Sequence, residues 1–338
     1  AYWWQVRARD GLEASAWSAP AIFYTKPAGV IRVPSETPTL ADAIAGAVSG
    51  DTIILADGAY SGDGFRDLTL GEQTITIMSE NGPAVTTIDL DGSPAEPHRA
   101  VQLHYYDLNH SDQYYATFVG MTFENGYADQ GGVILGNSSI GKFENCVFRG
   151  NEAQSGGVVY GPGSQVTFEG CQFESNAATN GGVSFYTSVE FVGCQFTGNQ
   201  SDNDIFASTT SATKTFRGCV LTGNIVPVAV GNALIVGGAE IEYSVIHDNQ
   251  ATVTYAFGAL EISHSTIAYN DQGVRLAGEC TANIHESVIA FNTDFGIRGY
   301  IEEFPFPPEW SSRLTLWHSA LFDNTYDITS FRSEYLDT

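Results

Sequence analysis

The stretch FRGNEAQSGGVVYGPGSQVTFEGCQFESNAATNGGVSF, residues 148–185, contains nearly the same pattern twice. In each copy a Phe is followed three residues later by Asn, and then by a Gly-Gly pair and apolar residues. The wider pattern is an apolar residue, a small residue, a second apolar residue and Asn. It recurs with the leading residues Phe118, Phe143, Phe168, Phe191, Phe216, Ile241, Ile262, Ile284 and Leu316, at intervals of 25, 25, 23, 25, 25, 21, 22 and 32 residues.

Repeats of this length indicate a solenoid. They are short for a pair of helices, and they contain alternating triplets such as Val166-Thr167-Phe168 rather than helical apolar spacing. Each unit is therefore predicted to form three short strands joined by turns. Stacked in register, equivalent residues lie about 4.8 Å apart, so the small position becomes a column: Met121, Cys146, Cys171, Cys194, Cys219, Ser244, Ser265, Ser287 and Ser319.

The Asn at the end of the pattern is predicted to form a second column. Asn tolerates left-handed backbone, and its amide can bond both its own turn and the next Asn in the stack. Gly126 replaces it in the first unit, and pairs such as Gly156-Gly157 allow a tight corner before the next strand. The column comprises Asn151, Asn176, Asn199, Asn224, Asn249, Asn270, Asn292 and Asn324.

With this pattern, residues 30–338 resemble right-handed parallel β-helix proteins of the pectate-lyase-like superfamily. The segment GDTIILADGAY, Gly50 to Tyr60, resembles the first coil of many such proteins. The segment TLADAIAGAV, Thr39 to Val48, has the apolar spacing of a helix, and in that superfamily a helix commonly caps the open end. The predicted fold is all-β: a parallel β-helix of about 12 coils with a short N-terminal capping helix.

The units from Phe118 to about Phe185 also resemble the repeats of chlamydial polymorphic membrane proteins, which are surface adhesins. The residues of that motif are structural, so the resemblance concerns the fold more than the function.

Residues 1–27 have a different pattern. YWWQVRARDGLEASAWSAPAIFYT, Tyr2 to Thr25, resembles the last two strands of a fibronectin type III domain, with a turn at Asp10-Gly11. Such a domain needs roughly 90–100 residues. We therefore expect a fragment of that domain at 1–27, a β-helix domain at 28–338, and a longer multidomain chain around both. The alternative is a hairpin that packs on the side of the solenoid.

Composition favours a secreted or cell-surface protein. The chain has 39 acidic and 14 basic residues, for a net charge of -25, which argues against nucleic acid and anionic membrane as partners. The sequence contains no run of 18 or more apolar residues, so no membrane insertion is expected within it.

The cysteines are predicted to be reduced. Four of the five occupy equivalent positions in successive coils, where parallel Cα–Cβ bonds give poor disulfide geometry. The redox state of Cys280, which lies outside the column, stays open. The spacing matches no zinc motif.

Two arginines are the candidates for catalysis. A polysaccharide lyase needs a base, commonly Arg or Lys, beside a uronate. Arg275 and Arg298 follow their column Asn by five and six residues, and we expect them to stack on one outer face. The alternative is that both are ordinary surface residues.

Acidic and imidazole side chains are the candidates for metal binding. Asp202 and Asp204 in SDND could bind calcium or form a solvated turn, and no other cofactor is expected. His264 and His318 share a column with Tyr243 and Glu286, with His285 one column over. An outward column of His could bind a metal ion. Since Tyr and Glu interrupt this column, we interpret its members as ordinary surface residues.

Two insertions are the candidates for ligand binding, because solenoids carry function on insertions. Both are rich in aromatic and polar groups, which can stack on sugars, bind a protein or simply pack on the solenoid. The candidate residues are Tyr105, Tyr106, Tyr114 and Tyr115 in the first insertion and Phe304, Phe306 and Trp310 in the second.

These patterns favour an extracellular module that binds a glycan or a surface protein in adhesion. The alternatives are a polysaccharide lyase or glycoside hydrolase of the same fold, and a structural spacer. An enzyme should have a lateral groove with converging Arg and carboxylates, whereas an adhesin should have aromatic loops over a flat acidic face.

Overall fold

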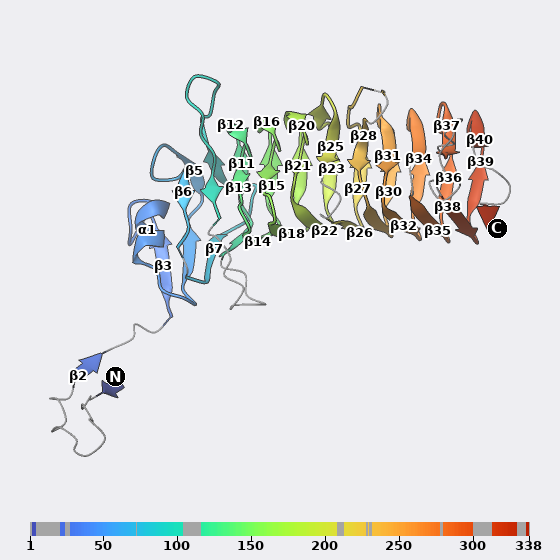
Figure 1. Ribbon diagram of the computed structural model, residues 1–338. Helices are drawn as coiled ribbons and strands as arrows, with labels where there is room; N and C mark the ends of the chain where they lie inside the picture. Colours follow the sequence, from blue (N-terminus) through green and yellow to red (C-terminus); the bar gives the residue numbers. More distant parts are fainter. Residues whose placement is uncertain are drawn as a thin grey trace, which may run out of the picture.

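The computed structural model describes residues 2–4, 21–23, 28–71, 73–103, 116–207, 213–227, 229, 232–277, 280–299, 313–329 and 336–337. Successive coils stack side by side into a rod, coloured from blue to red along the chain (Figure 1). Strands of neighbouring coils pair in parallel. The predicted parallel β-helix is therefore confirmed.

Three long sheets run the length of the rod. Sheet I has 13 strands, namely β3 (Val30–Val33), β4 (Thr52–Leu55), β7 (Ile75–Ser79), β10 (Ala116–Val119), β14 (Ile140–Glu144), β18 (Gln165–Glu169), β22 (Ser188–Val192), β26 (Lys214–Arg217), β29 (Ala239–Glu242), β32 (Ala259–Ser263), β35 (Thr281–His285), β38 (Arg313–Trp317) and β41 (Leu336–Asp337).

Sheet II follows sheet I in each coil and has 11 strands, namely β5 (Gly58–Ser61), β8 (Thr86–Asp89), β11 (Thr122–Glu124), β15 (Val147–Arg149), β19 (Gln172–Glu174), β23 (Gln195–Thr197), β27 (Val220–Thr222), β30 (Val245–His247), β33 (Thr266–Ala268), β36 (Val288–Ala290) and β39 (Ala320–Phe322).

Sheet III completes each coil, also with 11 strands, namely β6 (Leu68–Thr69), β9 (Val101–Gln102), β13 (Ile134–Leu135), β17 (Val159–Tyr160), β21 (Ser184–Phe185), β25 (Asp204–Ala207), β28 (Ala233–Val236), β31 (Thr252–Ala256), β34 (Gln272–Leu276), β37 (Phe295–Arg298) and β40 (Tyr326–Thr329).

A short fourth sheet adds to the predicted three. Directly after the position of the column Asn, which is Gly126 in the first of them, four coils contribute β12 (Tyr127–Gln130), β16 (Glu152–Ser155), β20 (Ala177–Asn180) and β24 (Gln200–Ser201). Separately, β1 (Tyr2–Trp4) and β2 (Ala21–Phe23) pair antiparallel, as a hairpin requires. Its assignment to a fibronectin type III-like domain stays a prediction.

The predicted capping helix is present as α1 (Leu40–Gly46). Thr39 caps its N-terminus by accepting a hydrogen bond from the Asp42 N–H through its side chain. Leu40, Ala43 and Ile44 are buried, so the helix covers the first coil with its apolar face. In the described residues no helix has the length and apolar character needed to span a membrane.

The core consists of side-chain columns. Phe118 stacks on Phe143 with ring centroids 4.9 Å apart, and the same column continues through Phe168, Phe191 and Phe216 at spacings of 5.2–5.3 Å. Such offset aromatic pairs add to the free energy gained by burial alone. In-register pairing of the coils therefore produces the apolar core directly.

The four column cysteines and Cys280 are buried and free, as predicted for the column. Each column thiol donates a weak hydrogen bond to a carbonyl of the preceding coil, as Cys171 Sγ does to Phe143 O at 3.4 Å. Burial raises the pKa of Cys171, and it raises that of Cys280 to about 11. The thiolate form is therefore disfavoured at both positions.

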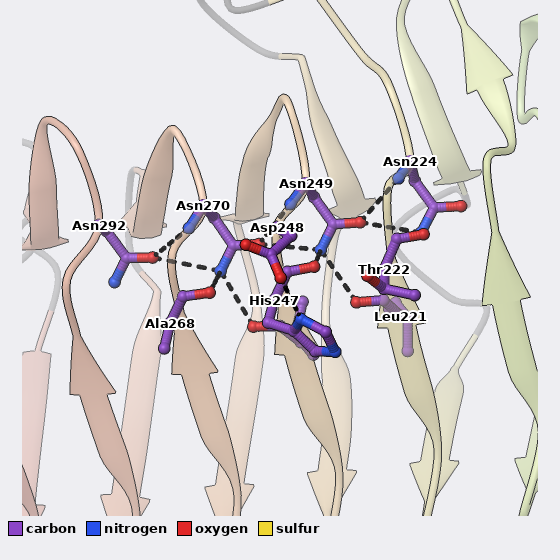
Figure 2. Close-up of polar contacts among 10 residues, drawn as sticks. Leu221, Thr222, Asn224, His247, Asp248, Asn249, Ala268, Asn270 and Asn292 are labelled. Atoms are coloured by element: carbon purple, nitrogen blue, oxygen red, sulfur yellow. Dashed lines mark hydrogen bonds and ion pairs between the residues drawn. The ribbon is translucent and has the colours of Figure 1, made fainter.

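The Asn column forms a continuous hydrogen-bonded ladder (Figure 2). Asn199, for example, donates from its backbone N–H and from Nδ2 to Asn224 Oδ1, at 3.0 and 2.9 Å, and from Nδ2 to Phe173 O at 2.9 Å. Its own Oδ1 accepts the equivalent pair from Asn176. The amides thus satisfy backbone groups that the turns would otherwise leave buried and unpaired.

One detail of the Asn prediction is wrong. The left-handed residue is not the Asn but the residue before it, as at Ser175 (φ 53°) and Asp248 (φ 53°). The preceding residue makes the turn, so that the Asn side chain can point inward along the ladder. At the other predicted corner Gly156 is left-handed (φ 70°), and a Cβ there would lie 2.3 Å from Val159 O.

Removal of one ladder amide tests this account. We expect Asn199→Ala to lower the free energy of unfolding by about 2–4 kcal/mol, because it leaves several buried donors and acceptors without partners. Chemical denaturation followed by circular dichroism measures the change. The control is Asn81→Ala, because Asn81 is exposed and bonds the exposed Asp57 carboxylate, so its effect should stay within about 0.5 kcal/mol. Equal effects of the two variants would contradict the ladder's role.

Candidate functional site

The outer face of sheet I carries a long groove, which we call the sheet I groove. It consists of three neighbouring hollows of about 350, 580 and 400 Å³. Thr213 and Thr215 line both the first and the second hollow, and Glu261 and Asn283 line both the second and the third. The hollows are therefore parts of one depression that follows the rod.

Coil register places one polar side chain per coil along this groove. Alternate residues of a strand point outward, and strand pairing aligns the outward residues of seven successive strands. Adjacent coils lie about 4.8 Å apart, comparable to the length of one pyranose ring. The aligned residues are Thr167, Glu190, Thr215, Glu240, Glu261, Asn283 and Thr315.

The described part of the groove is acidic. Glu240 and Glu261 line the second hollow, and Glu190 lines the first. The guanidinium of Arg217 lies between two carboxylates, 2.9 Å from Glu190 Oε1 and 2.8 Å from Glu242 Oε2. Because this cation is already paired twice, it leaves little positive charge for an anionic ligand.

The third hollow ends at a cluster of imidazole and carboxylate groups. His264 Nε2 lies 2.5 Å from Glu286 Oε2, and His285 Nδ1 lies 3.9 Å from the same oxygen. The other ring nitrogen of His285, Nε2, lies 3.1 Å from Glu261 Oε1. We call His264, His285 and Glu286, with Glu261, the imidazole cluster.

Polar and aromatic neighbours position the cluster. Asn283 Nδ2 donates to Glu261 Oε2 at 3.1 Å. The Tyr243 ring stacks on the His264 ring with centroids 4.6 Å apart and planes 20° apart. On the other side the Trp317 ring lies 6.4 Å from that of His285, and its side chain lines the third hollow. An exposed aromatic surface and several polar groups therefore meet at one end of the groove.

The turns that carry this cluster have an unusual backbone. The turn residue between sheets I and II is left-handed, and Gly170, Gly193 and Gly218 fill that position in successive coils. In later coils it is Tyr243 (φ 50°), His264 (φ 49°), Glu286 (φ 50°) and His318 (φ 49°), so the conformation is a property of the coil. Among residues other than Gly, it is Asn, Asp and His that adopt it most often.

As the surface interpretation expects, His264 and Glu286 are exposed and His285 is partly exposed. That interpretation did not anticipate that the three side chains lie together. The spacing contained a signal for this. His264 and Glu286 occupy equivalent positions 22 residues apart, one coil from each other, and His285 directly precedes Glu286. The alignment of Glu240 with Glu261, one coil apart, is a second such signal.

The two candidate catalytic arginines stack as expected but lie on another sheet. Arg275 and Arg298 are register partners on β34 and β37 of sheet III. Arg275 lies over the Tyr255 ring, and Arg298 over the Phe295 ring at 4.4 Å. Neither lines the hollows of the sheet I groove. Their catalytic role stays a prediction.

The candidate calcium residues have different surroundings. Asp202 is exposed, whereas Asp204 is buried and its Oδ1 accepts a 2.7 Å hydrogen bond from the Gly181 N–H. Burial raises the pKa of Asp204 to about 6, which the Gly181 hydrogen bond and the positive charge of Lys214 only partly offset. Calcium binding at this pair stays a prediction.

The candidate binding residues of the two aromatic insertions lie outside the described residues. They are Tyr105, Tyr106, Tyr114, Tyr115, Phe304, Phe306 and Trp310. Their proposed role is therefore untested.

Comparison with known proteins supports the fold. The family model for the right handed beta helix region matches residues 105–225. No curated protein matches the sequence.

Solved structures of similar fold include the A-module of the Azotobacter vinelandii mannuronan C-5 epimerase AlgE4, with 12% identity, coverage of 86% of this chain and 92% of that chain, and a TM-score of 0.47. A rhamnogalacturonan lyase has 12% identity, coverage of 88% of this chain and 81% of that chain, and a TM-score of 0.46. The pectin methylesterase from carrot has 11% identity, coverage of 93% of this chain and 91% of that chain, and a TM-score of 0.36. The family match and the parallel pairing of the strands show that the chain folds as a right-handed parallel β-helix.

The buried Asp204 gives a test by pH. Its folded-state pKa of about 6 lies above its ordinary 3.8, so the native state holds more protons than the unfolded state between these values. Stability contributed at this residue therefore falls as pH rises from about 4 to about 6. We expect the free energy of unfolding of Asp204→Asn, relative to that of the wild type, to increase by up to about 3 kcal/mol as the pH rises across that window. Denaturation curves at several pH values measure the difference, and a constant difference from pH 4 to 6 would refute the assignment.

Proposed function

We propose that this chain is a secreted or cell-surface module that binds a polysaccharide along the sheet I groove. The observation that supports this most is the row of aligned outward side chains from Thr167 to Thr315, which offers one hydrogen-bonding group per coil. A glycan chain lying along the rod would meet an equivalent group at each sugar. Trp317 at the end of the groove provides a surface on which a sugar ring can stack.

The charge of the groove favours a neutral glycan. Glu190, Glu240 and Glu261 line it, and Arg217 is already paired with two carboxylates. A uronate polymer would place like charges side by side in a partly enclosed site, which opposes binding. Sugar hydroxyls, by contrast, are good donors to carboxylates.

A polysaccharide-cleaving enzyme is the second candidate. It is favoured by the imidazole cluster, because His and Glu are side chains that transfer protons in such reactions. The cluster lies at the groove itself, with His285 and Glu261 lining the third hollow. Cleavage would shorten a bound glycan, whereas a binding module leaves its length unchanged.

Affinity electrophoresis in gels that contain glucans, galactans or polyuronates tests the proposal. We expect retardation by at least one neutral polysaccharide, and about tenfold weaker binding for Trp317→Ala, because a stacking surface is lost. The matched control is Tyr326→Ala on sheet III. Its side chain is 54% exposed, against 56% for Trp317, and it should leave the affinity unchanged.

The proposal fails if no neutral polysaccharide retards the protein, or if Tyr326→Ala weakens binding as much as Trp317→Ala. Size analysis of the glycan after incubation separates the two candidates. Shortened chains support the enzyme, and intact chains support the binding module.

A further inference from the structure

We propose that His264, His285 and Glu286 form a zinc site, with Glu261 orienting one of the ligands. This inference does not depend on glycan binding. One potential ligand atom from each of the three residues lies within 4.8 Å of the others. No other group of three or more potential ligands of this kind occurs in the described residues.

The distances suit a zinc ion. Two ligands about 2.0–2.1 Å from a tetrahedral zinc ion lie roughly 3.4 Å apart. The separations from Glu286 Oε2, 2.5 Å to His264 Nε2 and 3.9 Å to His285 Nδ1, lie on either side of that value. All three ligand atoms lie within 4.8 Å of one another, so the geometry is close to that of a zinc site.

The hydrogen bonds around His285 also fit a metal ligand. Its Nδ1 atom is buried and has no hydrogen-bond partner, an arrangement that costs about 1–3 kcal/mol. Its Nε2 atom faces Glu261 Oε1 at 3.1 Å, and Glu261 is held by Asn283. A carboxylate that accepts the N–H of a histidine fixes its tautomer and leaves the other nitrogen free to bind metal.

The His264 ring is held in a similar way by its surroundings. Tyr243 stacks on it from the preceding coil, and its Nε2 atom points at Glu286. The same left-handed turn recurs in successive coils from Asn145 to His318. At this end of the rod it carries His264 and Glu286 on adjacent coils, with His264 Nε2 facing the Glu286 carboxylate.

The ligand types select the metal. Two imidazoles and one carboxylate suit zinc, whereas calcium and magnesium prefer oxygen ligands throughout. Three protein ligands leave a fourth position for water or a sugar hydroxyl, as in open zinc sites. Since His285 and Glu261 line the third hollow, that position is next to the sheet I groove.

Isothermal titration calorimetry with zinc chloride tests the site, using metal-stripped, tag-free protein and no polysaccharide. We expect one zinc ion per chain and no comparable binding of calcium. His285→Ala and His264→Asn should abolish this binding, and Asn is chosen at 264 because it tolerates left-handed backbone. Glu261→Gln should weaken binding about 10–100-fold.

The control is His247→Ala. His247 is a partly exposed histidine on sheet II that pairs with Asp248, and its replacement should leave zinc affinity unchanged. Thermal unfolding confirms that each variant is folded. The proposal is overturned if zinc does not bind at saturable stoichiometry, or if one equivalent still binds to both His285→Ala and His264→Asn.

Discussion

The parallel, in-register pairing of successive coils is the constraint on which the rest of the structure depends. Each coil places its residues above those of the previous one, so the core columns such as the Phe column stay buried from coil to coil. The Asn ladder maintains this register, because Asn199 bonds both the coil before it and the coil after it. A slip of one residue would turn the core side chains outward.

The same register gives the outer face its chemistry. The parallel pairing that stacks Phe143 on Phe168 inside the solenoid continues along sheet I, where it aligns Glu240, Glu261 and Asn283 on the outside of later coils. Side chains of neighbouring coils thus act as one surface, although they are more than 20 residues apart in sequence. The turn position shows a change along the rod, from Gly218 in a middle coil to His264 near the C-terminal end.

The repeat in the sequence was enough to predict the β-helix, the reduced Cys column and the Asn ladder, because these features depend on residue type and spacing, which a repeat displays directly. The capping helix was predicted separately, from the apolar spacing of Thr39 to Val48 and from the resemblance to the superfamily. The site was harder to find, because His264 and His285 belong to different columns and the direction of their side chains at the turn is not visible in the repeat. Gly170, Gly193 and Gly218 at the equivalent position indicate the left-handed turn, but they do not show that His264 faces Glu286.

The buried polar groups show the same limit. Lys214 pairs in register with Val189, and both side chains are buried. A charged side chain therefore occupies a position that is apolar in the preceding coil. Burial lowers its pKa to about 8, despite the opposite effect of Asp204. Alternation alone places a residue inside but does not show which partner compensates its charge.

Anomalous diffraction at the zinc edge, from crystals grown with zinc, tests the central claim most directly. That claim is that coil register brings together side chains that act as one site on the sheet I face. The account predicts one strong peak per chain between His264 Nε2, His285 Nδ1 and the Glu286 carboxylate. Zinc bound elsewhere, with no peak at these three residues, would contradict it.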